Sequence, residues 1–347
     1  LRWLTGIAAD VGVLRLTALA MVAGGNPLGG MPPNASFVAF LNFALLLGYV
    51  GSSFVRALRG RLPVRLFDYL QTAAAWAIGW GGAVQLARAH GFGTRGLGVF
   101  AVFVGLAAYA AAFGVADQRE GKRQSFFYLS SLGLGLVLLG LSYAGGSTRT
   151  MIWAALALIA AAAGSHWDRV TLRAHAAVLL GAAWIEGGVA AEAVADISGR
   201  TDSVGVPSVG AVVMAVLTVM TTLIVLFARR LKKSGWAQRL PLTALLVMSG
   251  VVLASTLVSV GALVAPGSVV WMGTVALSAL AILAAMLASR WGVREAGWVV
   301  YPLLALTGFR VVLTDLASGS TIVFVIAFVA YGAALILSPT LVRLGRP

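Results

Sequence analysis

The chain has 347 residues, of which 60% are hydrophobic and only 10% are charged, and its formal net charge is +14. A soluble globular domain usually has about 25% charged residues and a disordered chain needs low hydrophobicity, so both classes are excluded. The sequence contains no cysteine, which excludes disulfides, Cys-ligated zinc, iron–sulfur clusters and thiol nucleophiles from this chain. We therefore predict a polytopic integral membrane protein.

Apolar stretches of about 20 residues recur along the chain, separated by short polar or basic breaks. About 20 helical residues, at 1.5 Å each, cross a bilayer core of about 30 Å, so each stretch predicts one transmembrane helix. The twelve predicted helices are residues 3–23, 34–57, 66–88, 96–116, 125–144, 149–165, 174–196, 207–228, 241–264, 269–289, 296–316 and 321–342. We predict one all-α transmembrane domain over 1–347, with a division into halves 1–170 and 171–347 as the alternative.

The basic residues predict the orientation of these helices. With the amino terminus inside, 19 of the 25 Lys and Arg residues lie in inside loops or near the termini, and four lie in outside loops: Arg88, Arg95, Arg149 and Arg200. Cytoplasmic loops of membrane proteins carry such an excess. We therefore expect both termini to be cytoplasmic and the bases to contact anionic lipids of a bacterial inner membrane. Nucleic acid is not an expected partner.

Ionisable residues inside the predicted helices are the candidates for chemistry, because a charge at mid-bilayer costs at least about 2.5–3.5 kcal/mol. Six residues form this set of buried ionisable candidates: Asp10, Arg15, Glu186, Glu192, Arg310 and Asp315. In a functional interpretation Glu186 binds a substrate or a proton, with Arg310 or Arg15 as its counter-ion. In a structural interpretation ion pairs only fix the packing of helices.

The spacing of the candidates argues against pairing within one helix. Asp10 and Arg15, and likewise Arg310 and Asp315, are five residues apart, which is 140° around an α-helix. Favourable local pairs are three or four residues apart. We therefore expect their partners on other helices.

No catalytic, cofactor-binding or metal-binding pattern stands out. The three histidines, His90, His166 and His175, lie at the ends of predicted helices, whereas paired haem ligands would lie at depth on facing helices. No HExxH motif or phosphate-binding Walker loop occurs. We expect a protein that is not an enzyme and binds no cofactor.

The carboxyl-terminal stretch resembles a known family. A basic residue is followed by an Asp-Leu pair, and then by a Phe and a Gly in the final apolar helix: Arg310, Asp315, Leu316, Phe328 and Gly332. This order is similar to the last two helices of the bacterial multi-pass family called "domain of unknown function 2339". The resemblance implies an inner-membrane protein of uncharacterised role and transfers no catalytic residue. Because members tend to be longer and this chain begins at Leu1, we expect a shortened member or a piece of a longer protein.

Two functions follow from these observations. The first is a non-enzymatic scaffold or accessory subunit that packs against other membrane proteins, as short loops and little polar material indicate. The second is a secondary transporter, proton-coupled in one version, that uses Glu186 and Arg310.

Overall fold

A computed structural model describes residues 2–23, 35–59, 66–89, 93–117, 123–143, 146–198, 208–230, 239–264 and 269–344. Every secondary-structure element in these ranges is helical. The chain divides into two compact units, Leu1–Gly145 and Gly146–Pro347. The prediction of one domain, or of halves 1–170 and 171–347, stays a prediction, although this division by contacts falls 25 residues before the boundary between those halves.

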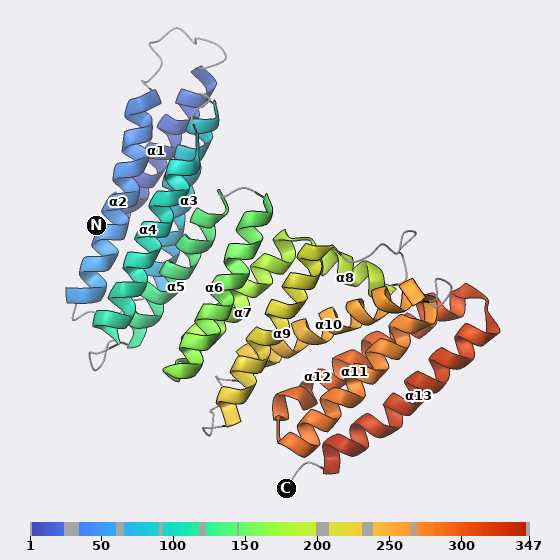
Figure 1. Ribbon diagram of the computed structural model, residues 1–347. Helices are drawn as coiled ribbons and strands as arrows, with labels where there is room; N and C mark the ends of the chain where they lie inside the picture. Colours follow the sequence, from blue (N-terminus) through green and yellow to red (C-terminus); the bar gives the residue numbers. More distant parts are fainter. Residues whose placement is uncertain are drawn as a thin grey trace. The chain divides into compact units, whose positions relative to one another are not determined.

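The first unit contains five α-helices and one π-helical turn (Figure 1). They are α1 (Arg2–Ala23), α2 (Ala35–Arg59), α3 (Leu66–Ala89), α4 (Arg95–Ala111), the π-helical turn η1 (Ala112–Ala116) and α5 (Arg123–Leu141). Helices α1, α2 and α3 pack on one another, and α4 packs along most of α5. The core between α3, α4 and α5 is aromatic, with the Trp80 indole donating a 3.0 Å hydrogen bond to the Tyr143 hydroxyl.

Glycines allow the helices of this unit to approach closely. A Cβ added to Gly105 would lie 3.0 Å from the carbonyl oxygen of Gly133, and one added to Gly133 would lie 2.9 Å from that of Gly105. Gly98 and Gly140 face each other in the same way. Membrane helices associate through small residues at such positions because lipid offers no hydrophobic driving force between them.

The second unit is built around α10. Its elements are α6 (Gly146–His166), α7 (Val170–Glu186), α8 (Val189–Ser198), α9 (Val209–Arg230), α10 (Arg239–Val264), α11 (Val269–Trp291), α12 (Arg294–Arg310), the π-helical turn η4 (Val311–Asp315), the 3-10 turn η5 (Leu316–Ser318) and α13 (Thr321–Leu344). Helix α10 contacts α7, α8, α9, α11 and α12, while α11 packs against α13 (Figure 1). The Thr222 hydroxyl of α9 bridges to α10, where it bonds the Leu245 carbonyl at 3.1 Å and the Ser249 hydroxyl at 2.7 Å.

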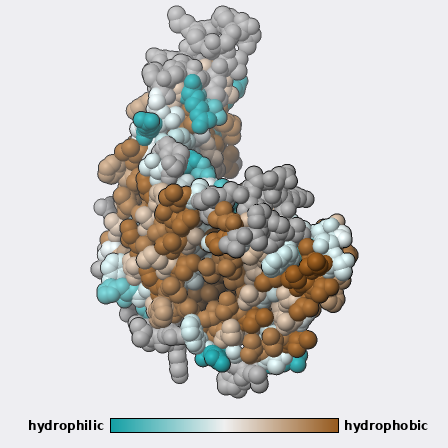
Figure 2. Space-filling model, turned by 45° about the vertical axis from the view of Figure 1, so that its right-hand side comes forward, coloured by the Kyte–Doolittle hydropathy of each residue, from teal (hydrophilic) through white to brown (hydrophobic). Residues whose placement is uncertain are grey.

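The apolar helices are those of a multi-pass membrane protein. Within the described residues, eight helices are long and apolar enough to cross a membrane, and α7 with α8 adds a ninth if the bent pair is one span. Figure 2 shows hydrophobic residues covering much of the visible surface. Large apolar side chains such as Phe309, Ile322 and Ile336 are more than two-thirds exposed. Contact with lipid accounts for such a surface, because soluble monomers rarely expose large contiguous apolar patches.

Each of the twelve predicted ranges contains a helix, but the count of twelve spans stays a prediction. One range was predicted wrongly in shape: 174–196 is not a single straight helix, because α7 and α8 differ in direction by 71°. Part of the basic pattern lies outside the described residues, namely Arg61, Arg65, Arg119, Lys122, Arg200, Lys232, Lys233 and Arg346.

Candidate functional site

The break between α7 and α8 is the centre of the candidate site. Helix α7 ends at Glu186, and α8 begins at Val189 after two glycines. Gly188 has a φ of +73°, a left-handed conformation that costs other residues roughly 1–2 kcal/mol. A Cβ on Gly187 would lie 2.8 Å from the Thr150 methyl group of α6. The two glycines therefore permit both the bend and the close approach of α6.

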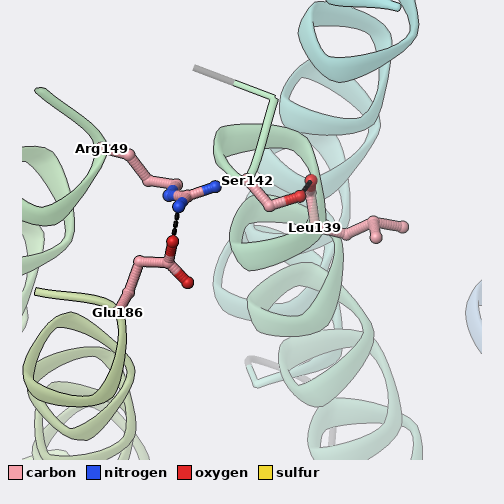
Figure 3. A network of polar contacts seen from close by, with 4 residues as sticks. All are labelled: Leu139, Ser142, Arg149 and Glu186. Carbon is pink, nitrogen blue, oxygen red and sulfur yellow. Dashed lines mark hydrogen bonds and ion pairs between the residues drawn. The ribbon is translucent and has the colours of Figure 1, made fainter. Parts of the chain in front are cut away.

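An ion pair joins α6 to the end of α7 at this break. The Arg149 guanidinium points to the Glu186 carboxylate (Figure 3), and its carbon lies 5.7 Å from the centre of the Trp153 ring. The sequence predicted Arg310 or Arg15 as the counter-ion of Glu186, and Arg149 takes this role instead. Helix α6 begins at Gly146 rather than at 149, so Arg149 belongs to its first turn and not to a loop.

A cavity of about 640 Å³ lies beside the break, between α8, α9 and α10. Its polar lining comes mainly from α8 and α10, with Glu192, Asp196, Ser255, Thr256 and Ser259. A second cavity of about 340 Å³ contains Arg149 and Glu186, and four residues line both cavities: Val189, Glu192, Ser208 and Ala211. The ion pair and the larger cavity therefore adjoin.

Asp196 fixes the polar wall of the larger cavity. Its Oδ2 accepts hydrogen bonds from the Ser255 hydroxyl at 2.5 Å and the Ser259 hydroxyl at 3.2 Å, both on α10. Glu192 lies one helical turn before Asp196, at the spacing that places two side chains on the same face. The sequence interpretation missed Asp196 because it is the last residue of the predicted range 174–196, where an acidic side chain is expected to reach the surface.

Arg310 and Asp315 form a second polar cluster, with Thr274 of α11. The Thr274 hydroxyl donates to Asp315 Oδ2, and the Arg310 Nε–H donates to the Thr274 oxygen at 3.2 Å. Arg310 is 5% exposed, whereas Thr274 and Asp315 are 0% exposed. Gly273 makes room for the guanidinium, because an added Cβ would lie 2.6 Å from Arg310 Nη2.

The expectation that Arg310 and Asp315 would have partners only on other helices was wrong. Residues 311–315 are π-helical, with the Leu316 N–H bonded to the Val311 carbonyl five residues earlier. The wider turn brings residues five apart closer than the 140° of a regular α-helix. The two side chains therefore meet at Thr274, and Asp315 is buried rather than at the outer end of a helix. The Thr314 hydroxyl also reaches the Ser198 carbonyl at the end of α8, at 3.4 Å.

The remaining candidates are in the first unit. Asp10 is 7% exposed and is hydrogen-bonded to the Tyr49 hydroxyl, which accepts a 3.0 Å hydrogen bond from Gln71. Arg15 is exposed on α1.

Burial within the protein was therefore predicted correctly for Asp10, Arg310 and Asp315 but wrongly for Arg15, Glu186 and Glu192. The last two are exposed because they line cavities beside the break. Within the described part of the chain, no three His, Asp or Glu side chains gather in a way that would hold a metal ion.

Comparisons with models of protein families, with curated proteins and with solved structures find no match to this chain. The resemblance of the carboxyl-terminal stretch to "domain of unknown function 2339" therefore stays a prediction.

Proposed function

We propose that the chain is a secondary transporter of twelve spans in a bacterial inner membrane, with both termini cytoplasmic, and that its solute enters the cavities beside the α7–α8 break. The excess of bases in the predicted inside loops supports the orientation. The same bases would contact anionic lipids on the cytoplasmic face.

The broken helix carries this proposal. Transporters commonly build their sites from discontinuous membrane helices, whose freed peptide groups face the solute. Non-helical backbone at membrane depth is tolerated where it is buried in protein or lines a water-filled cavity. Here the break at Gly187–Gly188 adjoins two cavities that contain the Arg149–Glu186 ion pair and two further carboxylates. A scaffold or accessory subunit has no need of such a cavity.

The proposed orientation places the site in the outer part of the membrane. Helix α7 has 17 residues, a length of about 25 Å in a bilayer core of about 30 Å. It starts at the cytoplasmic side, so Glu186 lies near the outer boundary of the core. Helix α8 then turns by 71° and runs more along the membrane than across it. The cavities are thus those of an outward-facing state.

Cysteine accessibility tests this proposal directly, because the natural chain has no cysteine of its own. Ser255→Cys places a thiol in the larger cavity. Leu257→Cys is the matched control, because Leu257 is exposed on the same helix but does not line the cavity. The probe is a membrane-impermeant trimethylammonium methanethiosulfonate, applied to right-side-out and to inverted vesicles.

A transporter must open its site to each side in turn, so we expect Ser255→Cys to react in both kinds of vesicle and Leu257→Cys in neither. Reaction of Ser255→Cys from one side only, or from neither, would overturn the transporter proposal. The scaffold or accessory-subunit role expected from the sequence would then be preferred.

A further inference from the structure

We infer that the solute is an organic cation with an apolar body, held with its charge against Glu192 and Asp196 and its body against α9. This inference rests on the proposed function and names the class of substrate. It follows from the composition of the two sides of the larger cavity and from its charge balance.

The two sides of the cavity differ in polarity. The residues contributed by α9 are all apolar: Ala211, Val212, Ala215, Val216, Val219 and Met220. Helix α8 contributes the two carboxylates, and α10 contributes three hydroxyls. Sites for small molecules are typically cavities of about 300–1,000 Å³ with mostly apolar walls and a few polar groups that orient the ligand. The cavity of about 640 Å³ fits this description and suits an amphipathic molecule.

The charges of the cavity call for a cation. Glu186 is paired with Arg149, which lines the smaller cavity. Among the described residues that line the larger cavity there is no Lys, Arg or His, although Glu192 and Asp196 both line it. Two like charges one helical turn apart repel each other, and a cleft of one sign with apolar walls concentrates ions of the opposite sign. A positively charged ligand would relieve this repulsion.

An inorganic cation fits the cavity less well. Calcium takes six to eight oxygen ligands, and magnesium keeps several waters in an octahedral shell. One Asp196 oxygen is already shared by Ser255 and Ser259, and the α9 side offers no side-chain oxygen. An ammonium or phosphonium group needs only the carboxylates, and its substituents would cover the apolar side.

Binding of tetraphenylphosphonium to the full chain in detergent tests the inference. Tetraphenylborate is the matched probe, since it has the same shape and the opposite charge. Titration calorimetry of both ions with the natural chain gives the charge preference, and we expect the cation to bind at least about tenfold more tightly.

The variants locate that binding. Glu192→Gln removes an exposed charge and should fold normally, and Asp196→Asn removes the hydrogen-bonded one. Each should weaken binding of the cation by about tenfold, which corresponds to about 1.4 kcal/mol. Asp117→Asn, in the first unit, is the control and should bind as the natural chain does.

Equal affinity for the two ions, or cation binding that Glu192→Gln leaves unchanged, would overturn the inference. Either result would leave the transporter proposal standing if Ser255→Cys reacts from both sides of the membrane. Labelling from one side only, together with a clear preference for the cation, would instead refute transport while keeping the site.

Discussion

Asp315→Asn should destabilise the protein strongly, because this substitution removes one charge from a buried cluster and leaves its shape almost unchanged. Asp315 is 0% exposed, and its charge acts on the Arg310 guanidinium, which is 5% exposed. Removal of one partner from a buried ion pair typically costs about 3–5 kcal/mol, since the other charge stays buried without compensation. The hydrogen bond from Thr274 can still form, because the Asn side chain keeps an acceptor oxygen.

The cost converts to a measurable change in Tm. The second unit has about 200 residues, and for that size 1 kcal/mol shifts Tm by about 2–4 °C. We therefore expect Asp315→Asn to lower Tm by about 6–20 °C, followed by tryptophan fluorescence of the purified chain in detergent. Glu192→Gln is the matched control, because a change at an exposed position usually alters stability by less than about 0.5 kcal/mol.

The double variant Arg310→Met, Asp315→Leu separates loss of pairing from loss of packing. Replacement of a whole buried ion pair by apolar residues of similar volume is often neutral or stabilising. The double variant should therefore recover most of the lost Tm. If Asp315→Asn melts within about 1 °C of the natural chain, or if the double variant melts no higher than the single one, the reasoning from the buried charge is wrong.

Three further changes test the backbone and the packing by the same Tm measurement. Gly188→Ala should cost roughly 1–2 kcal/mol because its φ of +73° is left-handed, and a cost near zero would mean that the bend at this residue differs. Gly273→Ala should cost about 1–3 kcal/mol, because its Cβ would displace the buried Arg310 side chain, whereas Gly332→Ala, with open space around it, should not destabilise. Thr222→Val should cost only about 0.6 kcal/mol, the average for hydrogen bonds between membrane helices, and a loss above 3 kcal/mol would show that this bridge does more than join two helices.

The positions of the helices were predictable because membrane helices are encoded by the length of apolar runs. The predicted range 241–264, for example, lies within α10, Arg239–Val264. The bend inside 174–196 was not predicted, although Gly187 and Gly188 were visible. Apolar residues continue on both sides of these glycines, so composition cannot distinguish a straight helix from two inclined ones. Only the left-handed φ of Gly188 fixes the bend.

The partners of the charged residues were less predictable than their positions. Arg149 was assigned to an outside loop, and its pairing with Glu186 depends on how α6 and α7 pack. The angle between Arg310 and Asp315 was computed for an α-helix, and a π-helical turn has no simple sequence signal. In both cases a local rule was applied where tertiary packing decides the outcome.

The glycine pairs of α4 and α5 have a consequence for motion in the first unit. Gly98 faces Gly140 and Gly105 faces Gly133, so the two backbones meet at two levels seven residues apart. If either helix slid along the other by one residue, a side chain such as Val102 would be driven against a backbone that now faces only hydrogen. The sliding motion of packed helices, called shear, is therefore blocked in this pair. Helices α4 and α5 must move together as one rigid hairpin, and any rearrangement of this unit has to take place where α1, α2 and α3 meet.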